Sequence, residues 1–382
     1  RATAGGLAGA LHSLAQLAAA GLTAPVPREL LDAAGRMATE HVAFFSAPQL
    51  CDVVDAFATC AVRDDAQVAE LFAAAGGAVA RAGHDLSAQH CAAAIRALAK
   101  CRVQDERLMT AVAGRLRQSE VRAGLDAEQL TSTLYGFAKF TSQDTALFDL
   151  LSIEARRRLH TMDVRLISSA LASLAKAGIS SPVLTARAAA QLRRASPADL
   201  DAASPDALRA LTMAFGKMQV RDAPLFDAFA EAFLRQGAAL FVHERCSHLV
   251  HISHAFTKVH LVHSGLFSAV ARALVERFAE LSVPDIVSYL HGLAKVGHQL
   301  PPALEERLRG LVSDDLAALG AFDLLKLATA ARRLGLQLPA VEAQVKAVLP
   351  NEPSGTDLLS PPRPPQPRKR RRKSARRMKW CW

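Results

Sequence analysis

The sequence predicts an all-α protein, a right-handed superhelix (solenoid) of about eight to nine helix-turn-helix repeats of 37–43 residues. Two observations predict this fold. A short pattern that ends in a cation returns along almost the whole chain at a nearly fixed spacing. No segment alternates apolar and polar residues over any length, so we expect no sheet. The clearest copies of the pattern occupy 95–100, 134–139, 171–176, 212–217, 253–258 and 290–295.

The last residue of each copy defines a marker position for the repeat. Six copies end in lysine, and weaker copies extend the series toward both ends of the chain. Successive markers are 37 to 43 residues apart, which is the size of one stacked helical unit. The markers are Gln16, Thr59, Lys100, Lys139, Lys176, Lys217, Lys258, Lys295 and Arg332.

The first helix of each repeat is expected to end near the marker. Thirteen residues before six markers stands a serine or aspartate, the residue types that cap helix N-termini. Gln49 and Gln129 follow two of these caps by three residues, as in a capping box. Apolar residues at 9, 5 and 2 positions before the marker share one helical face. The expected caps are Ser46, Ser87, Asp126, Asp163, Ser204 and Ser282.

The second helix of each repeat is expected to begin five residues after the marker. Capping residues stand there in several repeats, and a leucine follows three residues later. One such helix is predicted over 266–281. Each repeat is therefore helix, short turn, helix and longer link. The expected second caps are Asp64, Asp105, Asp144, Ser181 and Asp222.

Charge and composition divide the chain into two parts. The repeats are expected over 1–350, and 351–382 holds a proline-rich linker and a non-globular basic tail. The net charge of +10 comes from 358–382, because 1–357 carries 36 basic and 36 acidic side chains. No run of 18 apolar residues indicates a membrane span. The six cysteines show no disulfide or zinc spacing, and Cys60 and Cys101 are expected as small buried residues of a reduced compartment.

The basic tail has three interpretations. It is a solvated disordered segment, a nuclear-localisation signal, or an arm that orders on RNA, and the last is favoured. Arginine pairs with phosphate and stacks on bases, and tryptophan adds a stacking surface. The tail residues expected to bind RNA are Arg363, Arg368, Lys369, Arg370, Arg371, Arg372, Lys373, Arg376, Arg377, Lys379 and Trp380.

The recurrent cations at the markers also have two compatible interpretations. A cation at a helix C-terminus complements the helix dipole and the free carbonyls. Stacked repeats would also align these cations along one edge, where they could follow a phosphate backbone. We name them the lysine ladder, which consists of Lys100, Lys139, Lys176, Lys217, Lys258, Lys295 and Arg332.

Segments 134–148 and 211–226 resemble the consensus of organellar α-solenoid RNA-binding proteins. The resemblance lies in Phe-Ala-Lys or Phe-Gly-Lys, a later aspartate and a Leu-Phe pair, and it covers roughly 7–350. The similar families are the heptatricopeptide and octotricopeptide repeat proteins, with the related solenoids of RAP-domain and FAST-kinase-like proteins. These families act in mitochondria and plastids on messenger and ribosomal RNA, and some are built into mitochondrial ribosomes. No nuclease-like RAP domain follows the repeats, which argues against RNA cleavage.

The resemblance implies an RNA-binding protein, a structural ribosomal-RNA-binding component of a mitochondrial ribosome that takes part in translation. Its partners would be ribosomal RNA and neighbouring ribosomal proteins, with no membrane. One alternative is a free organellar factor for RNA stability or processing, and another is a protein scaffold of armadillo or HEAT type. Localisation is expected to be mitochondrial, with plastid as the alternative. Residues 1–28 contain two arginines and no acid, which fits the region near a transit peptide.

No enzymatic activity, cofactor, catalytic residue or metal site is expected. The chain contains no phosphate-binding loop, no zinc-protease motif and no nucleophile elbow. Histidines gather over 243–263, where His248, His251 and His254 are spaced to share a broad helical face. Zinc binding by these three is conceivable, but polar surface or RNA contact is the favoured interpretation.

Overall fold

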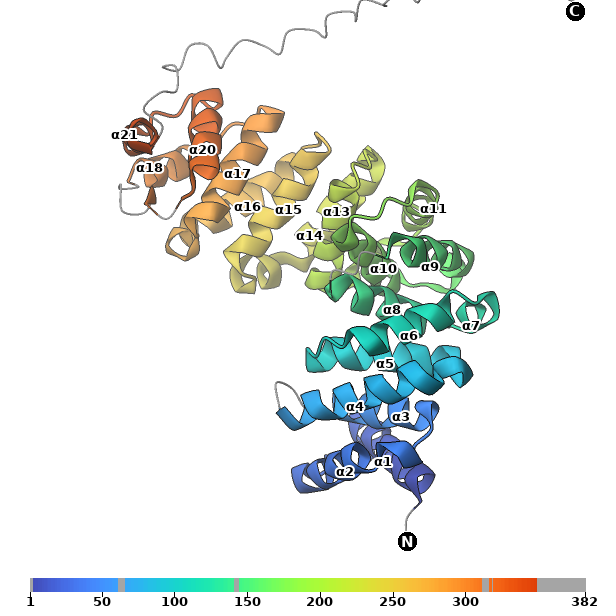
Figure 1. The fold of residues 1–382 in the computed structure, drawn as a ribbon. Helices are drawn as coiled ribbons and strands as arrows, with labels where there is room; N and C mark the ends of the chain where they lie inside the picture. The colour runs from blue at the N-terminus through green and yellow to red at the C-terminus, as the bar shows by residue number, and fades with distance from the viewer. Residues whose placement is uncertain (1–2, 61–65, 141–143, 311–315, 318, 349–382) are drawn as a thin grey trace, which may run out of the picture.

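The computed structural model describes residues 3–60, 66–140, 144–310, 316–317 and 319–348, and these form helices, turns and connecting segments with no strand. The basic tail and Asp64 lie outside the described residues. Figure 1 shows an elongated, curved array in which helices follow one another from the N-terminal end to α21. The predicted all-α, repeat-like architecture is confirmed over this part of the chain.

One row of the array, the A-row, contains the helices that end near the markers. Each A-row helix packs against the next one along the chain. The row therefore reproduces the repeat spacing in space. Its members are α1 (Ala4–Ala19), α3 (Ala47–Thr59), α5 (Ala88–Cys101), α8 (Ala127–Lys139), α10 (Val164–Ala177), α13 (Pro205–Lys217), α15 (Cys246–Lys258), α17 (Val283–Val296) and α20 (Ala321–Arg333).

The second helices of the repeats form the B-row. Contacts join α2 to α4, α4 to α6, α9 to α11, α14 to α16 and α16 to α18, while the short helix α7 (Ser119–Ala123) lies between α6 and α9. The B-row helices are α2 (Arg28–Glu40), α4 (Ala66–Ala82), α6 (Glu106–Leu116), α9 (Thr145–Arg158), α11 (Pro182–Leu192), α14 (Ala223–His243), α16 (Ser264–Glu276), α18 (Pro302–Arg309) and α21 (Pro339–Val348).

Small residues allow the A-row helices to approach closely. A Cβ atom built on Gly216 of α13 would lie 2.8 Å from the carbonyl oxygen of Ala255 in α15. A Cβ on Gly136 of α8 would lie 3.0 Å from the carbonyl oxygen of Ile95 in α5. Gly216 lies one residue before its marker and Gly136 lies three residues before its own. Nearly every repeat has Ala, Gly, Ser or Thr at these two positions. The close contact thus explains why these positions stay small.

The core lies between the two rows. Phe256 of α15, two residues before its marker, packs edge-on against Phe226 of α14 with ring centroids 4.9 Å apart. It also meets Phe267 of α16 at 6.2 Å, so it bridges two consecutive B-row helices. The apolar residues predicted at 9, 5 and 2 positions before the markers are buried in the same way along most of the array. Leu14 of α1 has the same position as Phe256 but is 41% exposed.

The six predicted caps of the first helices are confirmed. Each side chain accepts a hydrogen bond from a backbone N–H in the first turn, and Gln49 and Gln129 complete capping boxes. His90 completes a further box that the sequence did not indicate. Of the second caps, Ser181 occupies the N-cap position without a side-chain bond, so that prediction is wrong in detail. Asp105, Asp144 and Asp222 are confirmed.

Other boundaries differ from the predictions. The helix expected over 266–281 ends at Glu276, and the 3-10 turn η4 (Phe278–Glu280) follows it. Gly237 interrupts α14 with φ 61°, a conformation that favours glycine. Cys101 is buried as predicted, whereas Cys60 is only partly buried. Among the described residues, no helix has both the length and the apolar composition of a membrane span.

Candidate nucleic-acid interface

The lysine ladder lies at the C-terminal ends of the A-row helices. Each member belongs to the last turn of its helix, from α5 to α20. Since these helices pack side by side in order, the ladder follows one edge of the array. This placement agrees with both interpretations of the marker cations.

Two members of the ladder join consecutive repeats. The Nζ of Lys139 donates a hydrogen bond to the carbonyl oxygen of Ala99, at the end of the preceding A-row helix. Lys295 donates in the same way to the carbonyl of Lys258, at 3.2 Å. These carbonyls have no partner within their own helix, so the lysines cap the helix before them. The structural interpretation therefore holds for these two residues.

The A-row also has a free face that points away from the B-row. Residues four before each marker lie about half a helical turn from the core position two before it. His12, Arg96, Tyr135, His254 and His291 are such residues and are partly buried or exposed, whereas Asp55 and Ala328 at the same position are buried. Side chains on this face can therefore meet a partner.

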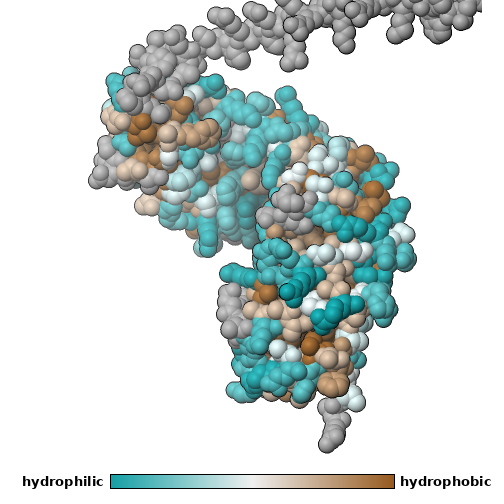
Figure 2. All heavy atoms as spheres, viewed as in Figure 1, coloured by the Kyte–Doolittle hydropathy of each residue, from teal (hydrophilic) through white to brown (hydrophobic). Residues whose placement is uncertain are grey.

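The free face is cationic over α13, α15, α17 and α20. Burial, then the nearby Lys217, Lys295 and Lys326, lower the pKa of Lys258, so these ammonium groups lie close enough to repel one another. Hydrophilic side chains cover much of this region in Figure 2. We name the group the cationic surface, and it consists of Lys217, His254, Lys258, His291, Lys295, Lys326 and Arg333.

Two histidines of the cationic surface are held in the neutral form. Burial lowers the pKa of His254 to about 4, and Lys258, Lys326 and His291 add repulsion. Burial also lowers the pKa of His291, followed by repulsion from Lys326, Lys295 and Arg333. The charged groups acting on the two rings, among the described residues, are cationic side chains and a second imidazole. The main electrostatic influences on both rings are therefore cationic.

The N-terminal part of the same face has mixed charge. Asp55 of α3 is fully buried and accepts hydrogen bonds from Arg96 of α5, with both Arg96 Nη2–Asp55 Oδ distances at 2.7 Å. Gln16 of α1 donates to the same carboxylate at 3.4 Å. Asp55 and Arg96 both lie four residues before their markers. The network therefore joins three consecutive A-row helices, and its role is structural.

A groove of about 620 Å³ follows this network along α1, α3, α5 and α8. Asp52 lies in it, and burial raises the pKa of its carboxyl group, with His12 and His90 partly opposing the effect. Asp126, Glu128 and Lys100 line the same groove. Acidic and basic groups thus alternate here, unlike on the cationic surface.

The histidines over 243–263 do not form the zinc arrangement that their spacing allows. His248 and His251 stack with ring centroids 6.5 Å apart, while His254 belongs to the cationic surface. Among the described residues, the ligand atoms that lie within 4.8 Å of one another are those of Asp206, Glu244 and His248. Asp206 already pairs with Arg209 and Glu244 with His248, so we assign no metal to this group.

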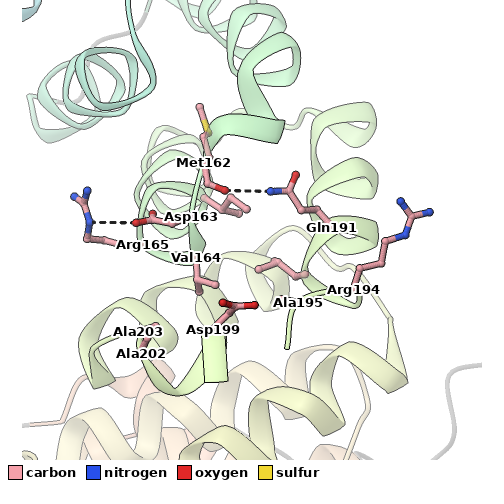
Figure 3. Close-up of a pocket in the computed structure, with 12 residues that line it drawn as sticks. Met162, Asp163, Val164, Arg165, Gln191, Arg194, Ala195, Asp199, Ala202 and Ala203 are labelled. Carbon is pink, nitrogen blue, oxygen red and sulfur yellow. Dashed lines mark hydrogen bonds and ion pairs between the residues drawn. The ribbon is translucent and has the colours of Figure 1, made fainter. Parts of the chain in front are cut away.

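A cavity of about 490 Å³ lies at the junction of α10, α11 and the short helix α12 (Pro197–Asp201) (Figure 3). Most of its polar residues already serve the local fold. Asp163 caps α10, and Asp199 completes the capping box of α12. Gln191 donates to the carbonyl of Met162 at 3.1 Å. Arg165 pairs with Asp163 and Glu128, so the guanidinium of Arg194 is the lining group without an assigned role, and one cation alone indicates no chemistry.

Sequence reasoning missed His291, Lys326 and Arg333 of the cationic surface, whereas His254 was among the histidines for which polar surface or RNA contact was favoured. His254 and His291 stand four residues before their markers, so an alignment of the repeats in register would have shown them. Lys326 and Arg333 fall outside the aligned positions, and only packing brings them to the surface. The predicted tail residues from Arg363 to Trp380 lie outside the described residues.

Comparison with known proteins adds no further information: no family model matches the chain, and no curated protein is significantly similar to it.

Proposed function

We propose that this chain is an RNA-binding α-solenoid, in which helix-turn-helix repeats wind into a right-handed superhelix. The two rows of sequentially packed helices and the repeat spacing of 37–43 residues support the solenoid. RNA would lie along the free face and the lysine edge of the A-row. The basic tail would add a second contact.

The cationic surface is the observation that carries this proposal. Four consecutive A-row helices bring lysines together, and burial first, then repulsion from Lys217, Lys295 and Lys326, lowers the pKa of Lys258. Such an arrangement is costly unless a polyanion neutralises it. A phosphate backbone presents charges at regular intervals and releases counterions when cations replace them.

The proposal extends to a cellular role, a structural component of a mitochondrial ribosome that holds ribosomal RNA. The resemblance of segments 134–148 and 211–226 to organellar repeat proteins supports it. Phosphate contacts position a protein without reading sequence, which suits such a role. A free RNA stability or processing factor would instead show a sequence preference that remains after deletion of 363–382.

A protein scaffold is a second candidate, and the N-terminal groove favours it. Its alternating acidic and basic lining fits a polypeptide better than a polyanion. Co-purification of protein partners after complete nuclease digestion would support the scaffold. Loss of all partners on digestion would support RNA binding.

The proposal is tested by a salt titration of RNA binding. The full chain and a fluorescein-labelled 20-nucleotide RNA are measured by fluorescence anisotropy at several salt concentrations. A variant with glutamine at Lys217, Lys258, Lys295 and Lys326 should bind more weakly, with a salt slope shallower by up to about 3. Unchanged binding by this variant would contradict the proposed interface.

A matched control removes the same charge from the B-row. Glutamine would replace four exposed cations of α4, α11, α16 and α21 that make no ion pair among the described residues. This variant should retain most of the affinity. An equal loss in both variants would indicate a general charge effect instead of a defined surface. The control positions are Arg81, Arg187, Arg272 and Lys346.

A further inference from the structure

His254 and His291 occupy equivalent positions on neighbouring helices. Each lies four residues before the marker of its helix, α15 or α17, and these helices pack side by side. Each ring influences the other electrostatically. The two imidazoles therefore form one cluster at the centre of the cationic surface.

The largest electrostatic influences of charged side chains on His254 and His291 are cationic, and Asp285 of α17 acts on the nearby His251 of α15. The groups that face His254 are Lys258 on its own helix, Lys326 of α20, His291, and the backbone at Ser288 of α17. The Nδ1 atom of His254 is buried and has no hydrogen-bond partner among the described residues. A buried nitrogen without a partner costs free energy.

We infer that His254, His291, Lys258 and Lys326 form a phosphate-binding site that takes up protons from solution when a phosphodiester group of RNA enters it. This inference rests on the proposed function. A phosphate supplies acceptor oxygens for imidazolium and ammonium donors together. No covalent bond forms or breaks, and each proton comes from the buffer.

Proton uptake follows from the electrostatics of the site. In the free protein, burial and the adjacent lysines keep both rings neutral at pH 7. A phosphate anion beside the rings would favour imidazolium and would also offset the lysine charges. Binding should therefore strengthen as the pH falls from 8 to 5.5, by up to about tenfold per pH unit for each proton taken up.

The test measures binding and proton uptake separately. The affinity of the full chain for tetramethylrhodamine-labelled 20-nucleotide oligouridylate is measured from pH 5.5 to 8 at constant ionic strength, because neither uracil nor this dye titrates in this range. Calorimetry in two buffers of different ionisation enthalpy gives the number of protons bound. We expect net uptake near pH 6.5 and a clear gain in affinity toward pH 5.5.

The key variant is His254→Asn with His291→Asn, which keeps a polar side chain but cannot gain charge. It should lose most of the proton uptake and most of the pH dependence, while its helical content at pH 8 stays unchanged. The control variant, His84→Asn with His160→Asn, alters two exposed histidines of the links and should behave like the wild type. Equal pH dependence in the key variant would overturn the inference.

Two further outcomes separate the inference from the proposed function. RNA binding that is strong but independent of pH would overturn the proton-linked site and leave the RNA-binding proposal intact. No RNA binding at any pH in low salt would overturn both. If polyglutamate binds as tightly as oligouridylate and with the same proton uptake, the site recognises carboxylates and the phosphate assignment is wrong.

Discussion

At the scale of single residues, the Asp55–Arg96 pair shows how charge is used inside the array. The Asp55 side chain is fully buried, whereas the Arg96 side chain remains 39% exposed. The two partners are therefore unequal. If Arg96 is removed, a carboxylate stays buried without its main partner; if Asp55 is removed, the guanidinium can still reach water.

This asymmetry predicts unequal effects of two alanine substitutions. Arg96→Ala should destabilise the region around α3 and α5 by about 3 kcal/mol. Asp55→Ala should cost less, about 1–2 kcal/mol, because the remaining charge is solvated. Hydrogen exchange of the α3 and α5 amides measures both effects locally. If Asp55→Ala is the more damaging change, the buried carboxylate does not depend on Arg96 as described.

At the scale of helices, five A-row helices are followed by a left-handed residue two positions after the marker. Gly178 and Gly297 occupy it with φ of 74° and 66°. Arg102, Gln219 and His260 occupy it in other repeats with φ between 57° and 59°. An L-residue in this conformation costs about 1 kcal/mol more than glycine. Part of the array is therefore strained at its turns.

At these turns, a change to glycine and a change from glycine to alanine should have opposite effects on the free energy of unfolding. Arg102→Gly should stabilise its repeat by about 0.5–1 kcal/mol, and Gly178→Ala should destabilise its own by about 1 kcal/mol. Gly114→Ala is the matched control, because Gly114 lies inside α6 with open space at its Cβ, and helix propensity favours alanine there. Thermal unfolding followed by circular dichroism tests the signs. Stabilisation by Gly178→Ala would contradict the role of the left-handed turn.

Local signals explain why helix starts were predictable and links were not. The caps at Ser46 and Asp126 depend on residues three apart in sequence, which a pattern can show. The link helices α7 and α12 and the interruption at Gly237 depend on how one B-row helix reaches the next. That geometry arises from packing between repeats, and no fixed spacing encodes it.

At the scale of the whole molecule, residues 1–357 have a formal net charge of zero, but their acidic and basic side chains are unevenly distributed in space. The N-terminal groove mixes acids and bases, whereas the cationic surface gathers lysines from four helices. Sequence reasoning found the lysine ladder, because its members repeat in register. It missed the separation of charge, since Lys326 becomes a neighbour of His254 only through packing of α15, α17 and α20.

The same separation predicts how stability depends on pH. Burial first, then nearby cations where present, lower the pKa values of His251, His254, His291 and His298 in the C-terminal half. An unfolded chain protonates these histidines near pH 6.5, but the folded chain resists protonation until lower pH. The unfolded state thus binds more protons between pH 6.5 and about 4, so the free energy of unfolding should fall as the pH decreases through this window.

Each histidine should contribute a slope of up to about 1.4 kcal/mol per pH unit within the window. Thermal unfolding of the full chain at pH 7, 6 and 5 measures the sum, and the variant with asparagine at His254 and His291 should show a shallower decline. The N-terminal helices should respond less to a fall in pH. Burial raises the pKa of Asp52 there, so its carboxyl group binds protons more readily in the folded chain. Its protonation therefore stabilises the folded state as the pH falls. Stability could instead decline equally with pH in the wild type and the variant, or unfolding at low pH could begin in α3 and α5. Either result would show that the buried histidines do not control acid stability.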